Sequence, residues 1–459
     1  MERVFVSKYA TTDGTLAIPV RPSRAVVERS LKPFKKQIRK FAFGLTPWTL
    51  DKFVETRGRK KKVYEAARRR YEQSGVRPSD WKVNTFVKAE KLDLTKKPDP
   101  VPRVIQPRSP VYNLVIGVYV SPLEKILYRE IARMFDHPTV IKGMNARAQG
   151  ECLHEKWSRL SDPVAIGFDV HRMDQHVSKE LLEWEHSIYK LYDLPKGVRN
   201  LLRKQLYNTG AAYCYDGKVK YSVRGRRMSG DMNTGLGNCL IMCAVVFSAL
   251  NGRFKYYLAN NGDDCVLFID SWNADEALAR VKTILSDINL PTEFEEPVSI
   301  FEEVEFCQCH PITDGDAWYM VRNPKTSLDK DSCTLKPVRS KREWNTLRAS
   351  VAMSGLACAG HMPVYKEFYN ALGRDAGVRV DRDTVETGLQ RLAKGMNMNG
   401  SVVTAEARAS FFRAFDISPD EQIALEDHYR KIRPEYQTPV PHQDWLREGH
   451  NAQLMGCHA

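Results

Sequence analysis

The chain has 459 residues, 42% of them hydrophobic, which is enough for about two to four domains or one large multi-lobed unit and argues against global disorder. Lys and Arg total 70 against 56 for Asp and Glu, so the net charge of +14 favours a polyanionic partner, nucleic acid first and an anionic membrane second. The ten cysteines are scattered, which is typical of buried thiols in a reduced, intracellular protein and not of a disulfide framework.

Cations dominate the N-terminal quarter of the chain. Residues 1–80 begin with extended sequence rich in Val, Thr and Pro, and a helical basic stretch follows that is either a solvated face or an RNA-tracking surface. Residues 82–110 then form a basic arm of short apolar runs, suited either to holding a triphosphate or to lying as a plain surface loop. The cations of this arm are Lys88, Lys91, Arg103 and Arg108.

The next elements place two carboxylates close together in the sequence. The pattern predicts an apolar helix over 111–135 and a strand over 163–170 that ends in Asp169. A carboxylate at a strand end beside an apolar sheet is where α/β-type proteins place ligands. Asp174 opens the following helix, so it is either part of a site or only a cap. The apolar face expected for that helix holds Val177, Leu181, Trp184, Ile188 and Leu191.

A polar loop leads into the most apolar helix of the chain. Residues 224–227 are basic, residues 228–235 form the loop, and the helix is expected from about 236 to 250. Thr234 and Asn238 are four residues apart and therefore share a helix face. Polar groups on an otherwise apolar helix need partners, and ordinary capping explains only the first turn.

Residues 256–270 read as a hairpin with its tight turn at Asn261-Gly262, because both residues tolerate the positive φ that such turns require. Asp263 and Asp264 follow at the tip, where adjacent negative charges repel unless a divalent cation binds them. The alternative is an exposed acidic turn. The remaining pattern predicts a helix at about 273–289, strands at 303–311 and 317–322, and an all-helical lobe from about residue 340.

Carboxylates thus come from two strands that sheet pairing can bring together. Two Mg²⁺ ions roughly 4 Å apart, bridged by such carboxylates, stabilise both the attacking and the leaving oxygen of a phosphoryl displacement. The basic arm can hold a triphosphate, and Asp174, Thr234 and Asn238 can read a ribose hydroxyl. Each feature is weak alone, but their order along the chain is specific.

That order resembles a known family. Asp169-x4-Asp174, then Ser229-Gly230-x3-Thr234-x3-Asn238, then Gly262-Asp263-Asp264 resemble motifs A, B and C of viral RNA-dependent RNA polymerases. Residues 86–91 and 102–108 resemble the motif F region. The sequence around 168–178 and 305–308 is similar to the tombusvirus-type polymerases of plant plus-strand RNA viruses. The resemblance covers roughly residues 82–330.

The resemblance implies an α+β fold, a closed right hand with fingers, a palm made of an antiparallel sheet and helices, and a helical thumb. The boundaries expected are 1–162 for an N-terminal extension and the fingers, 163–178 for the palm with motif A, 179–227 for a fingers insertion, 228–322 for the palm with motifs B to E, and 323–459 for the thumb and C-terminal tail.

The resemblance also implies roles for individual residues. Asp169 and Asp263 are the principal ligands of two Mg²⁺ or Mn²⁺ ions, and Asp264 is an auxiliary ligand. The nucleotide is expected to meet Lys88, Lys91 and Arg103 at its triphosphate, Asp174 and Asn238 at its 2′-OH, and Ser229 and Thr234 around that hydroxyl. RNA is expected to meet Arg108, Arg226 and Arg227. Residues 291–296 are acidic where the family often has a lysine, so no general acid is assigned.

The implied activity is replication of a plus-strand RNA virus genome from NTPs on template RNA. Polymerase segments of the family are often extensions of a membrane-targeting protein, whereas the longest apolar run here, 239–250, is too short to span a bilayer. The chain is therefore expected at membrane-associated replication sites in the host cytoplasm, through a viral membrane-anchoring partner or a missing N-terminal segment.

Two other functions explain part of the pattern. A reverse transcriptase shares the carboxylates, but a DNA-making pocket would exclude the 2′-OH with a bulky side chain in place of Asp174 and Asn238. A non-enzymatic basic RNA-binding protein explains the charge of +14 but not the acidic positions in polymerase order. Nucleotide incorporation on a homopolymer template separates all three.

Overall fold

The computed structural model of the chain describes residues 2–92, 100–214, 217–335, 337–378, 380 and 389–437. These residues divide into two compact units. Unit 1 draws on the segments Met1–Lys88, Asp99–Val140 and Leu160–Glu296, and unit 2 draws on Ala89–Pro98, Ile141–Arg159 and Pro297–Ala459. The mixture of helices and sheets of mainly antiparallel strands confirms an α+β chain.

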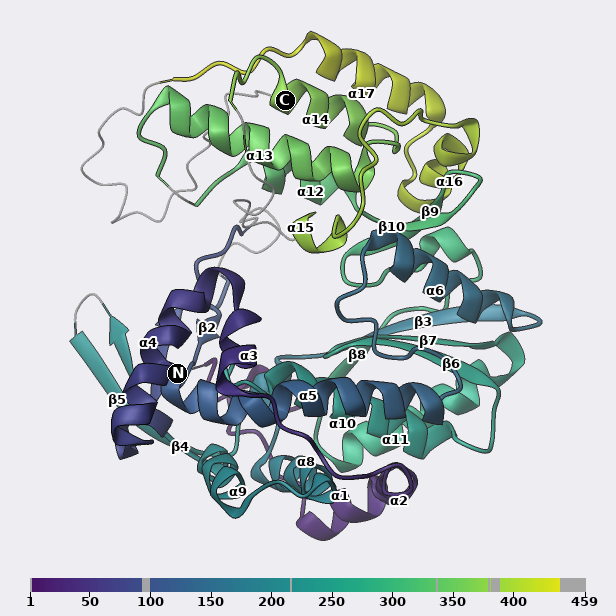
Figure 1. The fold of residues 1–459 in the computed structure, drawn as a ribbon. Helices are drawn as coiled ribbons and strands as arrows, with labels where there is room; N and C mark the ends of the chain where they lie inside the picture. The colour runs from purple at the N-terminus through teal and green to yellow at the C-terminus, as the bar shows by residue number, and fades with distance from the viewer. Residues whose placement is uncertain are drawn as a thin grey trace. The chain divides into compact units, whose positions relative to one another are not determined.

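Unit 1 is built around a four-stranded antiparallel sheet with the strand order β6-β7-β3-β8 (Figure 1). Its strands are β3 (Pro163–Val170), β6 (Tyr256–Asn261), β7 (Asp264–Asp270) and β8 (Thr292–Phe294). The apolar run at 164–168 makes β3 an inner strand, and its side chains are buried. The predicted strand at 163–170 and the predicted hairpin at 256–270 are both confirmed.

Helices surround this sheet and share one apolar core with it. The central helix α10 (Thr234–Leu250) is apolar on nearly every side and is therefore buried almost throughout. It packs against β6 and against α11 (Ala274–Asp287). The predicted helices at about 236–250 and 273–289 are confirmed, and so is the one at 111–135, which is α5 (Pro110–Met134). The other helices of unit 1 outside residues 171–189 are α1 (Arg24–Ser30), α2 (Lys32–Ile38), α3 (Leu50–Glu55), α4 (Lys61–Ser74) and α9 (Lys196–Arg203).

A second four-stranded sheet of unit 1, in the order β2-β1-β4-β5, contains the basic arm. Its strands are β1 (Val83–Val87), β2 (Val104–Ile105), β4 (Tyr207–Cys214) and β5 (Gly217–Arg224). Strand β1 runs antiparallel to β2 and parallel to β4. The backbone N–H of Gln106 also donates to the carbonyl of Ser229 at 2.6 Å, so this sheet is tied to the loop before α10.

The prediction of a single helix from Asp174 onward is wrong, because the chain forms two helices there. The short α7 (Met173–His176) carries Asp174, and α8 (Lys179–Tyr189) carries most of the predicted apolar face. Between them Val177 is extended, and the Ser178 hydroxyl accepts the N–H of Leu181 as the N-cap of α8. Asp174 therefore does not cap the long helix.

Unit 2 packs helices against a two-stranded sheet, β9 (Cys309–Thr313) with β10 (Trp318–Arg322). Its helices are α6 (Ala146–Ser158), α12 (Pro324–Ser332), α13 (Lys341–Ala359), α14 (Tyr365–Gly373), α15 (Leu389–Leu392), α16 (Ala405–Phe415) and α17 (Pro419–Lys431). Side chains of β9, β10 and α6 lie in the same core as the C-terminal helices. Among the described residues, every regular element from residue 340 onward is a helix, as predicted, but the compact unit that contains them also includes β9 and β10. The assignment of residues to fingers, palm and thumb stays a prediction.

The strand predicted at 303–311 begins later than expected. Residues Phe301–Glu303 form a 3-10 turn, and Cys307 and Gln308 have φ values of 53° and 61°. Such backbone angles are incompatible with an extended strand, so β9 starts only at Cys309. The strand predicted at 317–322 is confirmed as β10.

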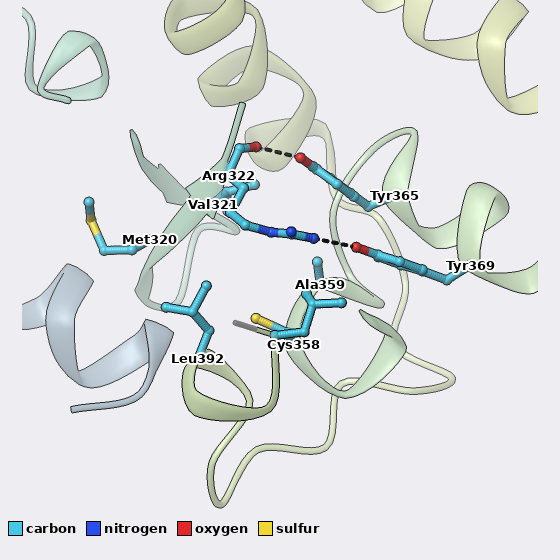
Figure 2. A pocket seen from close by; sticks show the side chains of 9 residues that line it. Met320, Val321, Arg322, Cys358, Ala359, Tyr365, Tyr369 and Leu392 are labelled. Carbon is cyan, nitrogen blue, oxygen red and sulfur yellow. Dashed lines mark hydrogen bonds between the residues drawn. The ribbon is translucent and has the colours of Figure 1, made fainter. Parts of the chain in front are cut away.

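A small pocket of unit 2 lies beside the end of β10 (Figure 2). The Arg322 guanidinium donates to the hydroxyl of Tyr369 at 2.8 Å, and the Tyr365 hydroxyl donates to the backbone carbonyl of Arg322 at 2.5 Å. The interior volume of the pocket is about 10 Å³, which leaves room for about one water molecule. The pocket is too small for a nucleotide.

Candidate functional site

The sheet of unit 1 brings the three predicted carboxylates together. The hairpin turns at Gly262, whose φ of +94° is one that residues with a Cβ rarely adopt. Asp263 lies in that turn, and Asp264 is the first residue of β7. In the antiparallel register Phe168 pairs with Cys265, so the next residue of β3, Asp169, comes opposite Asp264.

Burial disfavours the charged forms of two of these carboxylates, and neighbouring negative charges add to the effect at Asp169. Desolvation by the surrounding protein, followed by the negative charges of Asp263 and Asp264, raises the pKa of Asp169 to about 7. Desolvation also raises the pKa of Asp263, although Arg103 and a hydrogen bond from Asn238 act in the opposite direction. Several carboxylates that resist ionisation together are a charge arrangement that a cation would stabilise.

The donor set fits a hard divalent cation but is not a preformed cage. Within the described parts of the chain, no group of three or more His, Cys, Asp or Glu side chains is arranged so that it could hold a metal ion. Mg²⁺ is commonly bound through one or two carboxylates together with water and substrate phosphates, and not by a cage of protein ligands alone. Oxygen donors from Asp169, Asp263 and Asp264 match that mode of binding.

A pH-dependent metal affinity is expected from the raised pKa of Asp169. Because the folded protein holds this proton more tightly than the unfolded chain, the stability it contributes is present below pH ~4 and is lost as pH rises through about 7. Mg²⁺ must displace the proton, so its affinity should fall about tenfold for each pH unit below 7. Calorimetry in two buffers of different ionisation enthalpy measures the protons released.

The Asp169→Asn variant is the control for that titration. It removes the titrating group, so a weaker pH dependence and less proton release are expected. Wild-type protein whose Mg²⁺ affinity is the same at pH 6 and pH 8 would contradict the coupling.

A second group of polar side chains lies beside the carboxylates. The Ser229 hydroxyl donates to Oδ2 of Asp174, and Asn238 hydrogen-bonds to Asp174 and to Asp263. Burial raises the pKa of Asp174 to about 6, and the charge of Asp263 adds to the rise. The Thr234 hydroxyl donates to the carbonyl of Met228 at 3.0 Å and so closes the loop that carries Ser229. Asp174, Ser229 and Asn238 therefore meet as predicted.

The predicted triphosphate contacts separate into two groups. Arg103 is exposed, and its charge acts on both Asp174 and Asp263, which places it at the carboxylate site. Lys88 adjoins it, because the Lys88 N–H donates to the Arg103 carbonyl at 2.8 Å. Lys91 belongs to unit 2, where its ammonium donates to the backbone carbonyl of Lys330.

The prediction that Arg108, Arg226 and Arg227 contact RNA needs correction, because all three are buried, with exposed fractions of 3%, 5% and 3%. The Arg108 guanidinium is paired with Asp231 at 2.7 Å, and the Arg227 guanidinium is paired with Glu185 at 2.6 Å. Buried cations such as these three do not face a polymer in solvent. The sequence alone did not distinguish a buried arginine from one on the surface.

An N-terminal segment at residues 2–9 also supports the site. It contacts residues 171–175, which come shortly after Asp169 and include Asp174. Nε2 of Gln175 donates to the carbonyls of Glu2 and Val6 at 2.8 and 2.6 Å, and the Tyr9 ring stacks on His171 at 4.1 Å. These contacts join residues about 170 positions apart, so no periodicity in the sequence indicates them.

No helix within the described ranges is both long enough and apolar enough to cross a membrane.

Comparison with known proteins shows the family to which the chain belongs. The family described as "Viral RNA dependent RNA polymerase" matches residues 1–437. The chain is 39% identical over 450 residues to the RNA-directed RNA polymerase of Tobacco necrosis virus (strain A), covering 96% of this chain and 61% of the relative. It is also 39% identical over 442 residues to that of Turnip crinkle virus, covering 94% and 56%.

A third relative gives the same result over the whole chain. The RNA-directed RNA polymerase of Maize chlorotic mottle virus is 37% identical over 464 residues, covering 100% of this chain and 47% of the relative. The chain thus spans about half to three fifths of the length of these curated relatives. With a family match over residues 1–437, the chain belongs to the viral RNA-dependent RNA polymerase family.

Proposed function

We propose that this chain is the catalytic part of an RNA-directed RNA polymerase that replicates the genome of a plus-strand RNA virus. The observation that carries the proposal is the meeting of Asp169, Asp263 and Asp264 with a group that can read a ribose, Asp174, Ser229 and Asn238. The substrates are NTPs and template RNA, and the fold is a closed right hand. Family membership and relatives named RNA-directed RNA polymerase support this proposal.

In the proposed reaction the 3′-OH of the growing strand attacks the α-phosphorus of an NTP, and pyrophosphate leaves. Two Mg²⁺ or Mn²⁺ ions, when bound by Asp169, Asp263 and Asp264, would stabilise the charge on the attacking and leaving oxygens. Arg103 and Lys88, at the ends of the paired strands β1 and β2, neutralise and orient the triphosphate. Asp174 and Asn238 hold the ribose, with Ser229 fixing the Asp174 carboxylate.

The ribose group also favours RNA synthesis over DNA synthesis. A 2′-OH can donate to the Asp174 carboxylate and accept from the Asn238 amide, which satisfies both of its hydrogen-bonding functions. A deoxyribose would leave these groups unpaired. We propose further that the protein works at membrane-associated replication sites in the host cytoplasm, through a viral anchoring partner or a segment outside these 459 residues.

The direct test is nucleotide incorporation on a homopolymer RNA template. Purified protein with Mg²⁺ should incorporate the complementary NTP and release pyrophosphate, and it should use the dNTP far less. Incorporation of dNTPs in preference to NTPs would make the protein a reverse transcriptase. RNA binding without any incorporation would make it a non-enzymatic RNA-binding protein.

Arg103→Ala is expected to raise the apparent KM for NTPs about tenfold or more while weakening template binding much less. The reason is that Arg103 lies at the carboxylate site, where its partner is the triphosphate, and a charge-assisted hydrogen bond is worth about 1.5–3 kcal/mol. Steady-state kinetics and RNA binding by fluorescence anisotropy measure the two effects.

Arg59→Ala provides the matched control for Arg103→Ala. It removes the same charge from an exposed position in the basic stretch before α4, so the KM for NTPs should stay unchanged. If Arg103→Ala abolished RNA affinity and left KM as it was, Arg103 would belong to the template path.

A further inference from the structure

Arg227 joins the two residues that are proposed to read the ribose. Its backbone N–H donates to the carbonyl of Asp174 at 2.8 Å, and its side-chain Nε–H donates to Oδ1 of Asn238 at 2.9 Å. Asp174 is on α7 and Asn238 is on α10, so a single residue between β5 and α10 contacts both. A substitution at Arg227 would therefore affect both Asp174 and Asn238.

The Arg227 guanidinium is itself held by Glu185 of α8. Its Nη2 donates to Oε2 of Glu185 at 2.6 Å, and both side chains are almost completely buried. The other carboxylate oxygen, Oε1, accepts from Asn233 at 2.7 Å and from Tyr189 at 2.6 Å. Burial disfavours the charged carboxylate, yet the Arg227 guanidinium holds the pKa of Glu185 below its usual range. The pair is thus ionised and has little freedom to rotate.

The first turn of α10 leaves room for this ion pair only because residue 237 is glycine. A Cβ at Gly237 would lie 2.5 Å from Nη1 of Arg227 and 2.5 Å from Oε2 of Glu185. The ion pair therefore packs directly against the α10 backbone, one residue before Asn238. This close packing limits how far the Arg227 guanidinium can move relative to the Asn238 side chain.

The hydrogen bond from Arg227 determines which way the Asn238 amide faces. Because Oδ1 accepts from Arg227, the NH₂ group is turned toward Asp174 and Asp263, and hydrogen bonds from Asn238 act on both carboxylates. A flipped amide would put its N–H groups against the N–H of Arg227, two donors facing each other. An amide with its NH₂ group toward the site can donate to a 2′-OH, whereas the flipped amide cannot.

We infer that Arg227, anchored by Glu185, is a positioning residue that sets the preference for ribose over deoxyribose by fixing the orientation of the Asn238 amide. This inference rests on the proposed polymerase function and deepens it. Arg227 does not touch the substrate, and it acts through Asn238 and through the backbone of Asp174. The alternative is an internal ion pair that only stabilises the fold.

The test compares the kcat/KM for an NTP with the kcat/KM for the matching dNTP on one template. Arg227→Lys keeps a cation beside Glu185 but lacks the planar fork that binds Glu185 and Asn238 together. The ratio of NTP use to dNTP use is expected to fall about tenfold, mainly through lower NTP use. If the ion pair only stabilises the fold, Arg227→Lys would lower the kcat/KM for the NTP and for the dNTP by the same factor and leave their ratio unchanged.

A double-mutant cycle with Asn238→Ala then separates an action through Asn238 from an independent effect. In the Asn238→Ala background, Arg227→Lys should leave the ratio where Asn238→Ala alone put it. If the two substitutions lowered the ratio additively, the positioning role would be overturned. Arg108→Lys is the matched control, because Arg108 is another buried arginine paired with an aspartate, and its ratio should equal that of the wild type.

A second variant keeps the test decisive if Arg227→Lys does not fold. Glu185→Gln with Arg227→Met removes both buried charges at once, which avoids leaving one of them unpaired. The melting temperature identifies the folded variants, and this one is expected to show the same fall in ratio. Folded, active variants with an unchanged ratio would overturn the positioning role of Arg227 but not the proposed polymerase function. Wild-type protein that incorporates no nucleotide would overturn the proposed function instead.

Discussion

Asp263→Asn is expected to abolish RNA synthesis, with a loss of at least about a thousandfold, while the melting temperature and RNA binding stay nearly the same. Removing this ligand takes away charge stabilisation of the transition state worth at least several kcal/mol. Folding should not suffer, because Asp263 lies half-buried in a turn, where burial raises its pKa and so already disfavours its charged form. In the metal-free protein an amide there relieves repulsion with Asp169.

Single-turnover incorporation with Mg²⁺ measures RNA synthesis, and thermal unfolding of the same preparation measures the melting temperature. The matched control is Asp275→Asn, which removes the same charge from an exposed position in the first turn of α11. This control should keep wild-type activity. Substantial synthesis by purified Asp263→Asn protein would remove Asp263 from the metal site.

Asn238→Ala is expected to have the second largest effect, on the choice of sugar. A buried polar group left unpaired costs about 1–3 kcal/mol, so losing the amide that meets the 2′-OH should shrink the preference for NTP over dNTP roughly tenfold to a hundredfold. NTP use should fall much more than dNTP use. Some stability should be lost as well, because Arg227 loses the acceptor of its Nε–H.

The control for Asn238→Ala lies on the same helix. The Ser248 hydroxyl of α10 is buried and has no hydrogen-bond partner among the described residues, so Ser248→Ala should change neither stability nor the nucleotide ratio. If Asn238→Ala lowered the use of both nucleotides equally, Asn238 would be a packing residue only. The comparison needs purified protein, one template and a fixed Mg²⁺ concentration.

Local sequence signals predicted the elements that carry the carboxylates. The apolar run before Asp169 predicted β3, and the Asn261-Gly262 turn predicted the hairpin, because strand period and turn chemistry depend only on neighbouring residues. Once these strands pair in one sheet, Asp169 must lie near Asp264. The same local reasoning missed the helices α1, α2 and α3, and it joined α7 to α8 although the break at Ser178 divides them.

The sequence by itself determined the order of motifs and therefore the family and the carboxylate set. Only the tertiary structure decided what the arginines do, because a cation looks the same in sequence whether it faces solvent or a buried partner. Arg103 is exposed at the site, whereas Arg227 is buried and paired with Glu185, a residue 42 positions away. Such pairings depend on the packing of α8 against α10, and so does the orientation that they impose on Asn238.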